Sequence, residues 1–123
     1  MLNLVDVNAE DHEGAYVIEP AVGGCHTEMV ALLLKHGADP NVQLKTTETV
    51  LHYAAARRDA MQIIKLLVRH GAMINALDKK RQTPLDVAVE CKRLENVKLL
   101  RRLGALSAAG LPRNAGRRRS GKR

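Results

Sequence analysis

The fold of this chain is decided by the stretch Ile63-Ile64-Lys65-Leu66-Leu67-Val68-Arg69-His70-Gly71-Ala72. A similar leucine-rich segment runs into Gly37-Ala38 before it, and another runs into Gly104-Ala105 after it. The three glycines are therefore 34 and 33 residues apart. A period of this length is typical of stacked repeats, in which each unit buries its apolar face against its neighbours. Because such arrays present extended surfaces, the pattern favours a binding function.

The composition restricts what kind of core the repeats can build. The chain has 123 residues, which is enough for one domain, and 46% of them are apolar. It contains no Phe, no Trp and two Tyr. We therefore expect thin layers of Leu, Ile, Val and Ala between helices, without large aromatic pockets. No apolar run approaches the ~20 residues that a membrane-spanning helix needs, so we expect no membrane segment.

The net charge of +7 belongs mainly to the C-terminal end. Six of the 20 lysines and arginines lie in residues 111–123, where there is no acidic residue. The other 14 share residues 1–110 with all 13 acidic residues, so that part of the chain is nearly neutral. The six are Arg113, Arg117, Arg118, Arg119, Lys122 and Arg123. Such a segment has little to bury, and we expect it to be disordered. It is open to three interpretations: a nuclear-import signal, a salt-sensitive polyanion contact, or a solubilising tail.

Each repeat unit can be divided into two helices and a turn. In the second unit, Thr49 is a candidate N-cap for a helix over 50–56, and a second helix follows over about 61–69. Gly71 ends that helix, because glycine adopts the left-handed conformation of a C′ residue at little cost. In the third unit, Thr83 is the candidate cap and Pro84 occupies the first helical position, where its missing N–H is not needed.

These residues resemble the ankyrin-repeat family. Thr83-Pro84-Leu85-Asp86-Val87-Ala88 is similar to the family's Thr-Pro-Leu-His-x-Ala signature, and Leu51-His52-Tyr53-Ala54-Ala55 matches its central part. Residues 24–41 resemble the second-helix half of the consensus. The resemblance implies an all-α solenoid of stacked helix-turn-helix units with short β-hairpin fingers. It also implies that His52 bonds to the cap at Thr49, and that the chain binds proteins and is not an enzyme.

The two ends of the array differ. We expect residues 1–10 to be the remnant finger of an upstream repeat, residues 11–105 to form three units, and residues 106–123 to form the disordered basic tail. Pro20 falls in the first helix of unit 1 and should weaken or shorten it. Asn96 and Arg101 replace apolar residues of the earlier units, as the outer face of a terminal repeat requires. The exposed first unit suggests a fragment or isoform of a longer array.

No catalytic, cofactor or metal site is predicted. The five histidines do not have zinc-ligand spacing, and we expect structural roles for them. Cys25 and Cys91 lack a CxxC partner, and without a signal peptide they are expected to be reduced thiols of the cytoplasm or nucleus. Phosphate-binding and nucleophile motifs are also missing from the sequence, which argues against an enzyme.

The expected function is that of an adaptor, scaffold or inhibitor that binds a protein through its fingers and the concave face of its first helices, as a monomer in the cytoplasm, the nucleus or both. Lys79-Lys80-Arg81 is either a solvated turn or a contact for an acidic partner. The alternatives are a nuclear or nucleic-acid-associated factor that uses the basic tail, with Ser120 as a possible phosphosite, and a regulatory fragment of a larger protein. The expected partner-binding residues are His12, Glu13, Lys45, Thr46, Glu48, Tyr53, Arg57, Lys79, Lys80, Gln82 and Glu90.

Overall fold

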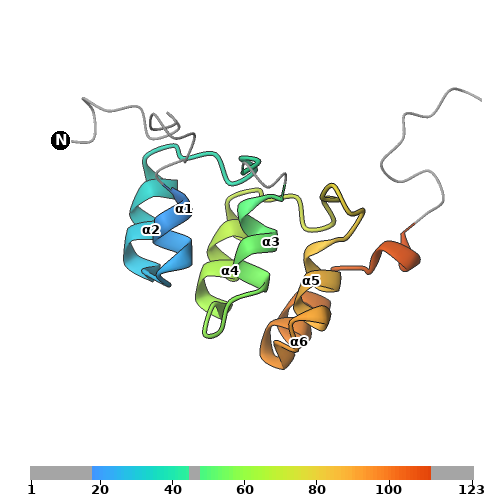
Figure 1. Cartoon of the computed structure of the whole chain (residues 1–123). Coiled ribbons are helices and arrows are strands. Elements are labelled where there is room, and N and C mark those ends of the chain that lie inside the picture. Colours follow the sequence, from blue (N-terminus) through green and yellow to red (C-terminus); the bar gives the residue numbers. More distant parts are fainter. Residues whose placement is uncertain (1–17, 45–47, 112–123) are drawn as a thin grey trace, which may run out of the picture.

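The computed structural model describes residues 18–44 and 48–111, and it consists of helix pairs joined by long loops. The pairs are α1 (Ile18–Gly23) with α2 (Thr27–Lys35), α3 (Val50–Ala55) with α4 (Met61–Arg69), and α5 (Pro84–Glu90) with α6 (Leu94–Arg102). The three pairs stand side by side in chain order (Figure 1). The all-α solenoid of stacked helix-turn-helix units, which the family resemblance implies, is thereby confirmed.

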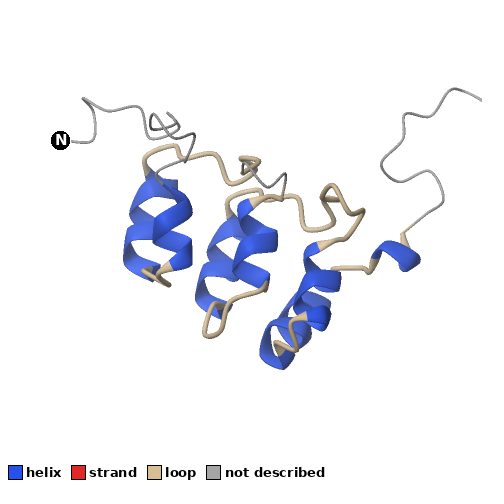
Figure 2. Cartoon of the chain, viewed as in Figure 1, coloured by secondary structure: helices blue, strands red, loops and turns tan. Residues whose placement is uncertain are grey.

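The first helices of the units form one layer and the second helices form another. Along the array, α1 contacts α3 and α3 contacts α5, whereas α2 contacts α4 and α4 contacts α6. The longest loops leave the same end of each pair, and we call them fingers (Figure 2). Within the described ranges, no residue lies in a strand, and the first finger retains a single β-bridge between Gln43 and Thr49.

The core is the aliphatic material between these layers. Its most deeply buried large side chains come from every unit, with Leu67 of α4 in the middle of the array. The interior therefore relies on leucine, isoleucine, valine and alanine, as the composition predicts. The fully buried aliphatic side chains of large volume include Ile18, Val22, Val30, Leu33, Val50, Leu51, Ile63, Ile64, Leu67 and Leu100.

The predicted helix starts are confirmed by capping boxes. The side chain of Thr49 accepts a hydrogen bond from the backbone N–H of His52, and the backbone N–H of Thr49 donates to Nδ1 of His52. Thr83 and Asp86 make the equivalent reciprocal pair at the start of α5. Such caps satisfy backbone donors that would otherwise lack partners at the helix N-terminus.

Turn residues with positive φ separate the helices. Gly37, Gly71 and Gly104 have φ values of 98°, 101° and 99° after α2, α4 and α6. The two helices of unit 3 are joined through Lys92, whose φ is 60°. Glycine adopts this region freely, but a residue with a side chain pays a steric penalty there. Cys25 and Asp59 adopt the same conformation in the first two units.

Pro20 does not shorten α1. It lies in the first turn of the helix, where a backbone N–H has no intrahelical partner in any case. With six residues, α1 is as long as α3.

The expected outward position of Asn96 is wrong. Asn96 is 2% exposed, and its Nδ2 donates to the carbonyl oxygens of Ala55 and Arg57. These oxygens lie at the C-terminal end of α3, where helical carbonyls lack partners. Arg101, the other proposed outer residue, is exposed.

The folded structure continues beyond the predicted boundary at Ala105. The backbone N–H of Leu106 donates to Oδ1 of Asn75, and that of Ala108 donates to Oδ2 of Asp86. A 3₁₀ turn, η2 (Ala108–Gly110), follows. Residues 106–110 are therefore attached to the last repeat, which differs from their predicted place in the tail. Residues 1–17 and 112–123, including most of the predicted tail, lie outside the described ranges.

Candidate partner-binding groove

The second finger, which we define as residues 76–82, has a shape fixed by its own hydrogen bonds. Oδ1 of Asp78 accepts from the backbone N–H groups of Lys80, at 2.9 Å, and Gln82, at 2.8 Å. The backbone N–H of Asp78 donates to the Gln82 carbonyl, and Arg81 takes a left-handed conformation with φ of 62°. The turn thus closes tightly and leaves Lys79, Lys80 and Arg81 exposed at its tip.

Gln82 attaches this finger to both neighbouring first helices. Its backbone carbonyl lies 2.8 Å from Nε2 of the buried His52 in α3. Its side-chain Nε2 donates to Oε1 of Glu90 in α5 at 3.0 Å. Because the Thr49 N–H can only donate and the Gln82 carbonyl can only accept, the bonds assign His52 as the neutral tautomer protonated on Nε2.

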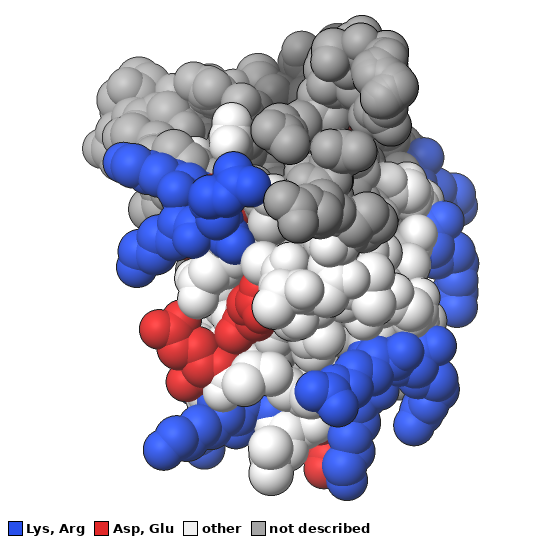
Figure 3. All heavy atoms as spheres, turned by 90° about the vertical axis from the view of Figure 1, so that its right-hand side faces the viewer, with Lys and Arg blue, Asp and Glu red and all other residues white. Residues whose placement is uncertain are grey.

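A groove lies between this finger and the adjoining faces of α3 and α5. It has a volume of about 320 Å³. Its lining combines small apolar groups with side chains of both charges. On the α5–α6 end of the molecule, basic and acidic side chains form separate groups (Figure 3). We call it the finger groove, and it is lined by Glu48, Ala56, Asp78, Lys79, Lys80, Gln82, Val87, Glu90 and Cys91.

The structure brings together five of the residues expected to bind a partner. They come from two fingers and α5, and all five line the finger groove: Glu48, Lys79, Lys80, Gln82 and Glu90. Their role in binding remains a prediction. His12, Glu13, Lys45 and Thr46 lie outside the described residues, as do Ser120 and the six basic residues of the tail.

Tyr53 and Arg57 lie elsewhere. The Tyr53 hydroxyl packs so closely against Gly23 of α1 that a Cβ at position 23 would require the Tyr53 ring to move. The guanidinium of Arg57 lies 5.8 Å from the centroid of the Tyr53 ring, within the range of a cation–π contact. Arg57 also lines a second pocket, at the end of the helix pairs opposite to the fingers.

Sequence reasoning missed four groove residues: Ala56, Asp78, Val87 and Cys91. Val87 lies three residues before Glu90 and four before Cys91, so helical spacing was an available signal for both residues. Asp78 precedes the lysine pair and belongs to a residue type that often closes turns through its side chain. Ala56 carried no such signal.

The described residues do not suggest a metal site. Within the described ranges, no group of three or more His, Cys, Asp or Glu side chains is placed to hold a metal ion. Cys25 and Cys91 are free thiols, and Sγ of Cys25 donates to the carbonyl oxygen of Arg58 at 3.4 Å. Among the described helices, none combines the length and apolar character needed to cross a bilayer.

Comparison with known proteins agrees with the repeat geometry. A family model described as ankyrin repeats, in three copies, matches residues 4–107. The chain is 37% identical over 75 residues to putative ankyrin repeat protein FPV031 of Fowlpox virus (strain NVSL), a match that covers 58% of the chain and 22% of the relative. It is 34% identical over 83 residues to cyclin-dependent kinase inhibitor 2A of Monodelphis domestica, covering 68% of the chain and 48% of the relative.

A third relative is ankyrin repeat and SOCS box protein 6 of Mus musculus. The identity is 38% over 81 residues, which covers 64% of the chain and 19% of the relative. The chain therefore spans less than half the length of each of these three relatives.

Proposed function

This chain belongs to the ankyrin-repeat family, and we propose that it binds a protein partner in the finger groove as a non-enzymatic adaptor, scaffold or inhibitor. Ankyrin repeats are generally protein-protein interaction modules. The observation that carries the proposal is the convergence of Glu48, Lys79, Lys80, Gln82 and Glu90 on one groove. They come from segments that are separate in the sequence.

The hydrogen bonds of the groove support binding by a rigid surface. Asp78 fixes the turn, and Gln82 ties the finger to α3 and α5 through His52 and Glu90. A surface held in this way loses little conformational entropy when a partner docks, so more of the contact energy contributes to affinity.

The charges of the groove indicate the chemistry of its partner. Lys79 and Lys80 project from the finger, whereas Glu90 lies on α5. The buried Val87 adds an apolar contact. A complementary partner surface would place acidic groups against the two lysines of the finger, a basic group beside Glu90 and apolar groups against Val87.

The test is quantitative affinity capture from cell extract with the full chain as bait, read by mass spectrometry. The variant Lys79→Glu/Lys80→Glu alters the groove, and Lys65→Glu/Lys98→Glu makes the same charge change at exposed positions of α4 and α6. We expect at least one protein to be lost from the groove variant and retained by the control variant. That protein should then bind the purified chain by titration calorimetry, with the same ranking of variants.

Identical capture by the groove variant and the unmodified chain would exclude this groove as the docking site. Circular dichroism of both variants establishes that a lost partner does not reflect lost helices.

The basic tail supports a second proposal, namely that the chain is a nuclear or nucleic-acid-associated factor. The supporting observation is the six basic residues within 111–123, without an acidic residue among them. Deleting this segment should abolish salt-dependent binding to heparin and any nuclear accumulation, and leave partner binding by the groove unchanged. Equal heparin affinity with and without the segment at low salt would exclude the proposal.

A further inference from the structure

A second pocket lies at the end of the helix pairs opposite to the fingers. It is formed by the loop between α3 and α4 and by the loop between α5 and α6, together with the start of α6. We propose that this pocket, which we call the loop pocket, binds an acidic peptide segment that carries an apolar residue beside its carboxylates. The loop pocket is lined by Arg57, Arg58, Asp59, Lys92, Arg93, Leu94, Glu95 and Asn96.

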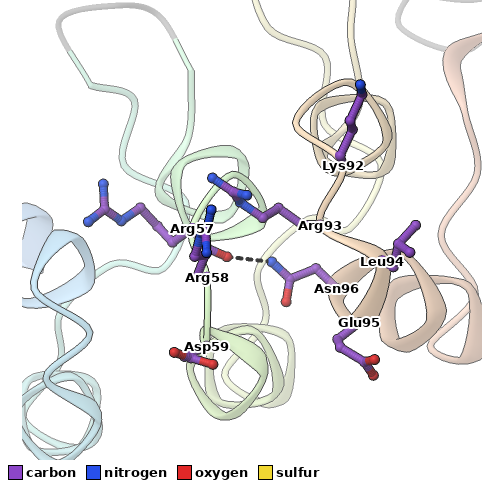
Figure 4. A pocket seen from close by; sticks show the side chains of 8 residues that line it. All are labelled: Arg57, Arg58, Asp59, Lys92, Arg93, Leu94, Glu95 and Asn96. Carbon is purple, nitrogen blue, oxygen red and sulfur yellow. Dashed lines mark hydrogen bonds between the residues drawn. The ribbon is translucent and has the colours of Figure 1, made fainter.

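The lining of the loop pocket has an excess of basic side chains. Four basic side chains line the pocket, two from each loop, against two acidic ones. Figure 4 shows Arg57, Arg58, Lys92 and Arg93 on one side of the pocket and the carboxylates of Asp59 and Glu95 on the other. Basic side chains therefore outnumber acidic ones in the lining, and an excess of one charge in a concave site attracts ligands of the opposite charge.

Two arginines of the loop pocket, Arg93 and Arg57, are held in place by contacts with the protein. Nε of Arg93 donates to the carbonyl oxygen of Ala56 at 2.8 Å, which leaves the other nitrogens of its guanidinium available for a ligand. The Arg57 guanidinium lies over the Tyr53 ring. Asn96 holds the Arg57 carbonyl at 2.8 Å, as the dashed line in Figure 4 marks. A pre-organised guanidinium loses less entropy when it binds an anion.

The lining of the loop pocket favours a carboxylate that has an apolar neighbour. A guanidinium matches a carboxylate with two parallel hydrogen bonds. Leu94 lines the same pocket and is 68% exposed, so it offers an apolar contact beside the cations. Asp59 and Glu95 repel any anionic group placed beside them, which a long, uniformly charged phosphate backbone crossing the pocket could not avoid but a short peptide could. A short acidic peptide with an apolar residue fits all three features better than a nucleic acid does.

The proposal is tested with a short fluorescein-labelled peptide in which glutamates flank a leucine, titrated with the full chain by fluorescence anisotropy. The variant Arg58→Gln/Lys92→Gln removes two exposed pocket cations that lie in the turns between helices. The control Lys65→Gln/Lys98→Gln removes two exposed cations of α4 and α6, so that all effects of net charge, including attraction to the basic tail, are matched.

We expect the pocket variant to weaken peptide binding about tenfold or more, and the control variant to weaken it about twofold or less. Replacing the leucine of the peptide with serine should also weaken binding to the unmodified chain. Amide chemical shifts followed during the titration should change most at residues 57–59 and 92–96.

Equal weakening by the two variants would overturn the proposal, because binding would then follow net charge alone. Shift changes confined to residues 112–123 would overturn it as well, since the peptide would then bind the tail. A single-stranded oligonucleotide of the same charge is titrated in parallel. If it bound more tightly than the peptide and were as sensitive to the pocket variant, the pocket would be a nucleic-acid site and the proposal would be wrong.

Discussion

Nε2 of His52 lies 2.8 Å from the carbonyl oxygen of Gln82, which links the first helix of one repeat to the finger that leads into the next. Because His52 is 0% exposed and Nδ1 accepts the N–H of Thr49, both ring nitrogens are satisfied in the interior. One side chain therefore caps its own helix and holds the finger that forms the candidate groove.

Replacing this histidine should destabilise the protein. His52→Ala leaves the Thr49 N–H without its side-chain partner, removes one of the two hydrogen bonds to the Gln82 carbonyl and opens a cavity, so we expect a loss of at least about 2 kcal/mol of unfolding free energy. The measurement is urea denaturation followed by circular dichroism. His36→Ala is the control, because His36 is exposed at the end of α2, and it should change stability by at most about 0.5 kcal/mol. Equal effects would contradict the linking role.

The turn at Lys92 should be improved by glycine. Its φ of 60° costs a side-chain-bearing residue about 1–2 kcal/mol, which exceeds the entropy that glycine adds to the unfolded chain. Lys92→Gly should therefore stabilise the protein by roughly 0.5–1 kcal/mol. Lys98→Gly, in the middle of α6, should instead cost about 1 kcal/mol, as glycine does in a helix. Thermal melts of both variants check the opposite signs, and a melting temperature lowered by Lys92→Gly would refute the argument.

Replacing the buried Asn96 with leucine tests whether its hydrogen bonds stabilise the protein more than apolar packing would. In spite of its greater hydrophobicity, leucine at this position should destabilise the protein by about 1–3 kcal/mol, because it leaves the carbonyls of Ala55 and Arg57 unpaired. Chemical denaturation of Asn96→Leu gives the value. The exposed neighbour Glu95 serves as control through Glu95→Ala, with a change of at most about 0.5 kcal/mol expected. A more stable Asn96→Leu protein would show that the amide is not needed.

Leu67 lies where the three units share their core. It is 0% exposed, and Leu67→Ala should cost about 2–5 kcal/mol. Leu94→Ala removes the same atoms from a side chain that is 68% exposed and should cost far less. Urea titrations of the two variants give their unfolding midpoints, and we expect the lower midpoint for Leu67→Ala. Similar midpoints would mean that the core does not depend on Leu67.

The features that recur in each repeat could be predicted from the sequence. The glycine period predicted the stacking, and Thr49 and Thr83 predicted two helix starts that their capping boxes confirm. Asn96 was misassigned because a polar residue in a helical apolar pattern normally indicates the surface. Its partners are the carbonyls of Ala55 and Arg57, 41 and 39 residues away, which only stacking brings near.

Of the two candidate sites, the finger groove was partly predictable from the sequence and the loop pocket was not. The finger residues were foreseeable because turns project from an array, and Lys79 and Lys80 stand in such a turn. The loop pocket was not foreseeable, since Arg58 and Lys92 belong to different units and read singly as solvated loop residues. Their common pocket arises from the way in which the second and third helix pairs pack together.

Asn75 holds the backbone N–H of Leu106 at 2.8 Å, as Asn41 holds that of Met73 at the same distance. The junction after the third repeat is thus built like the junction after the second. This equivalence makes Leu106 a natural splice point for protein engineering: a further unit grafted there would meet an acceptor already in place. The length of the array, and with it the size of the ligand that it can contact, could then be changed by one repeat unit at a time.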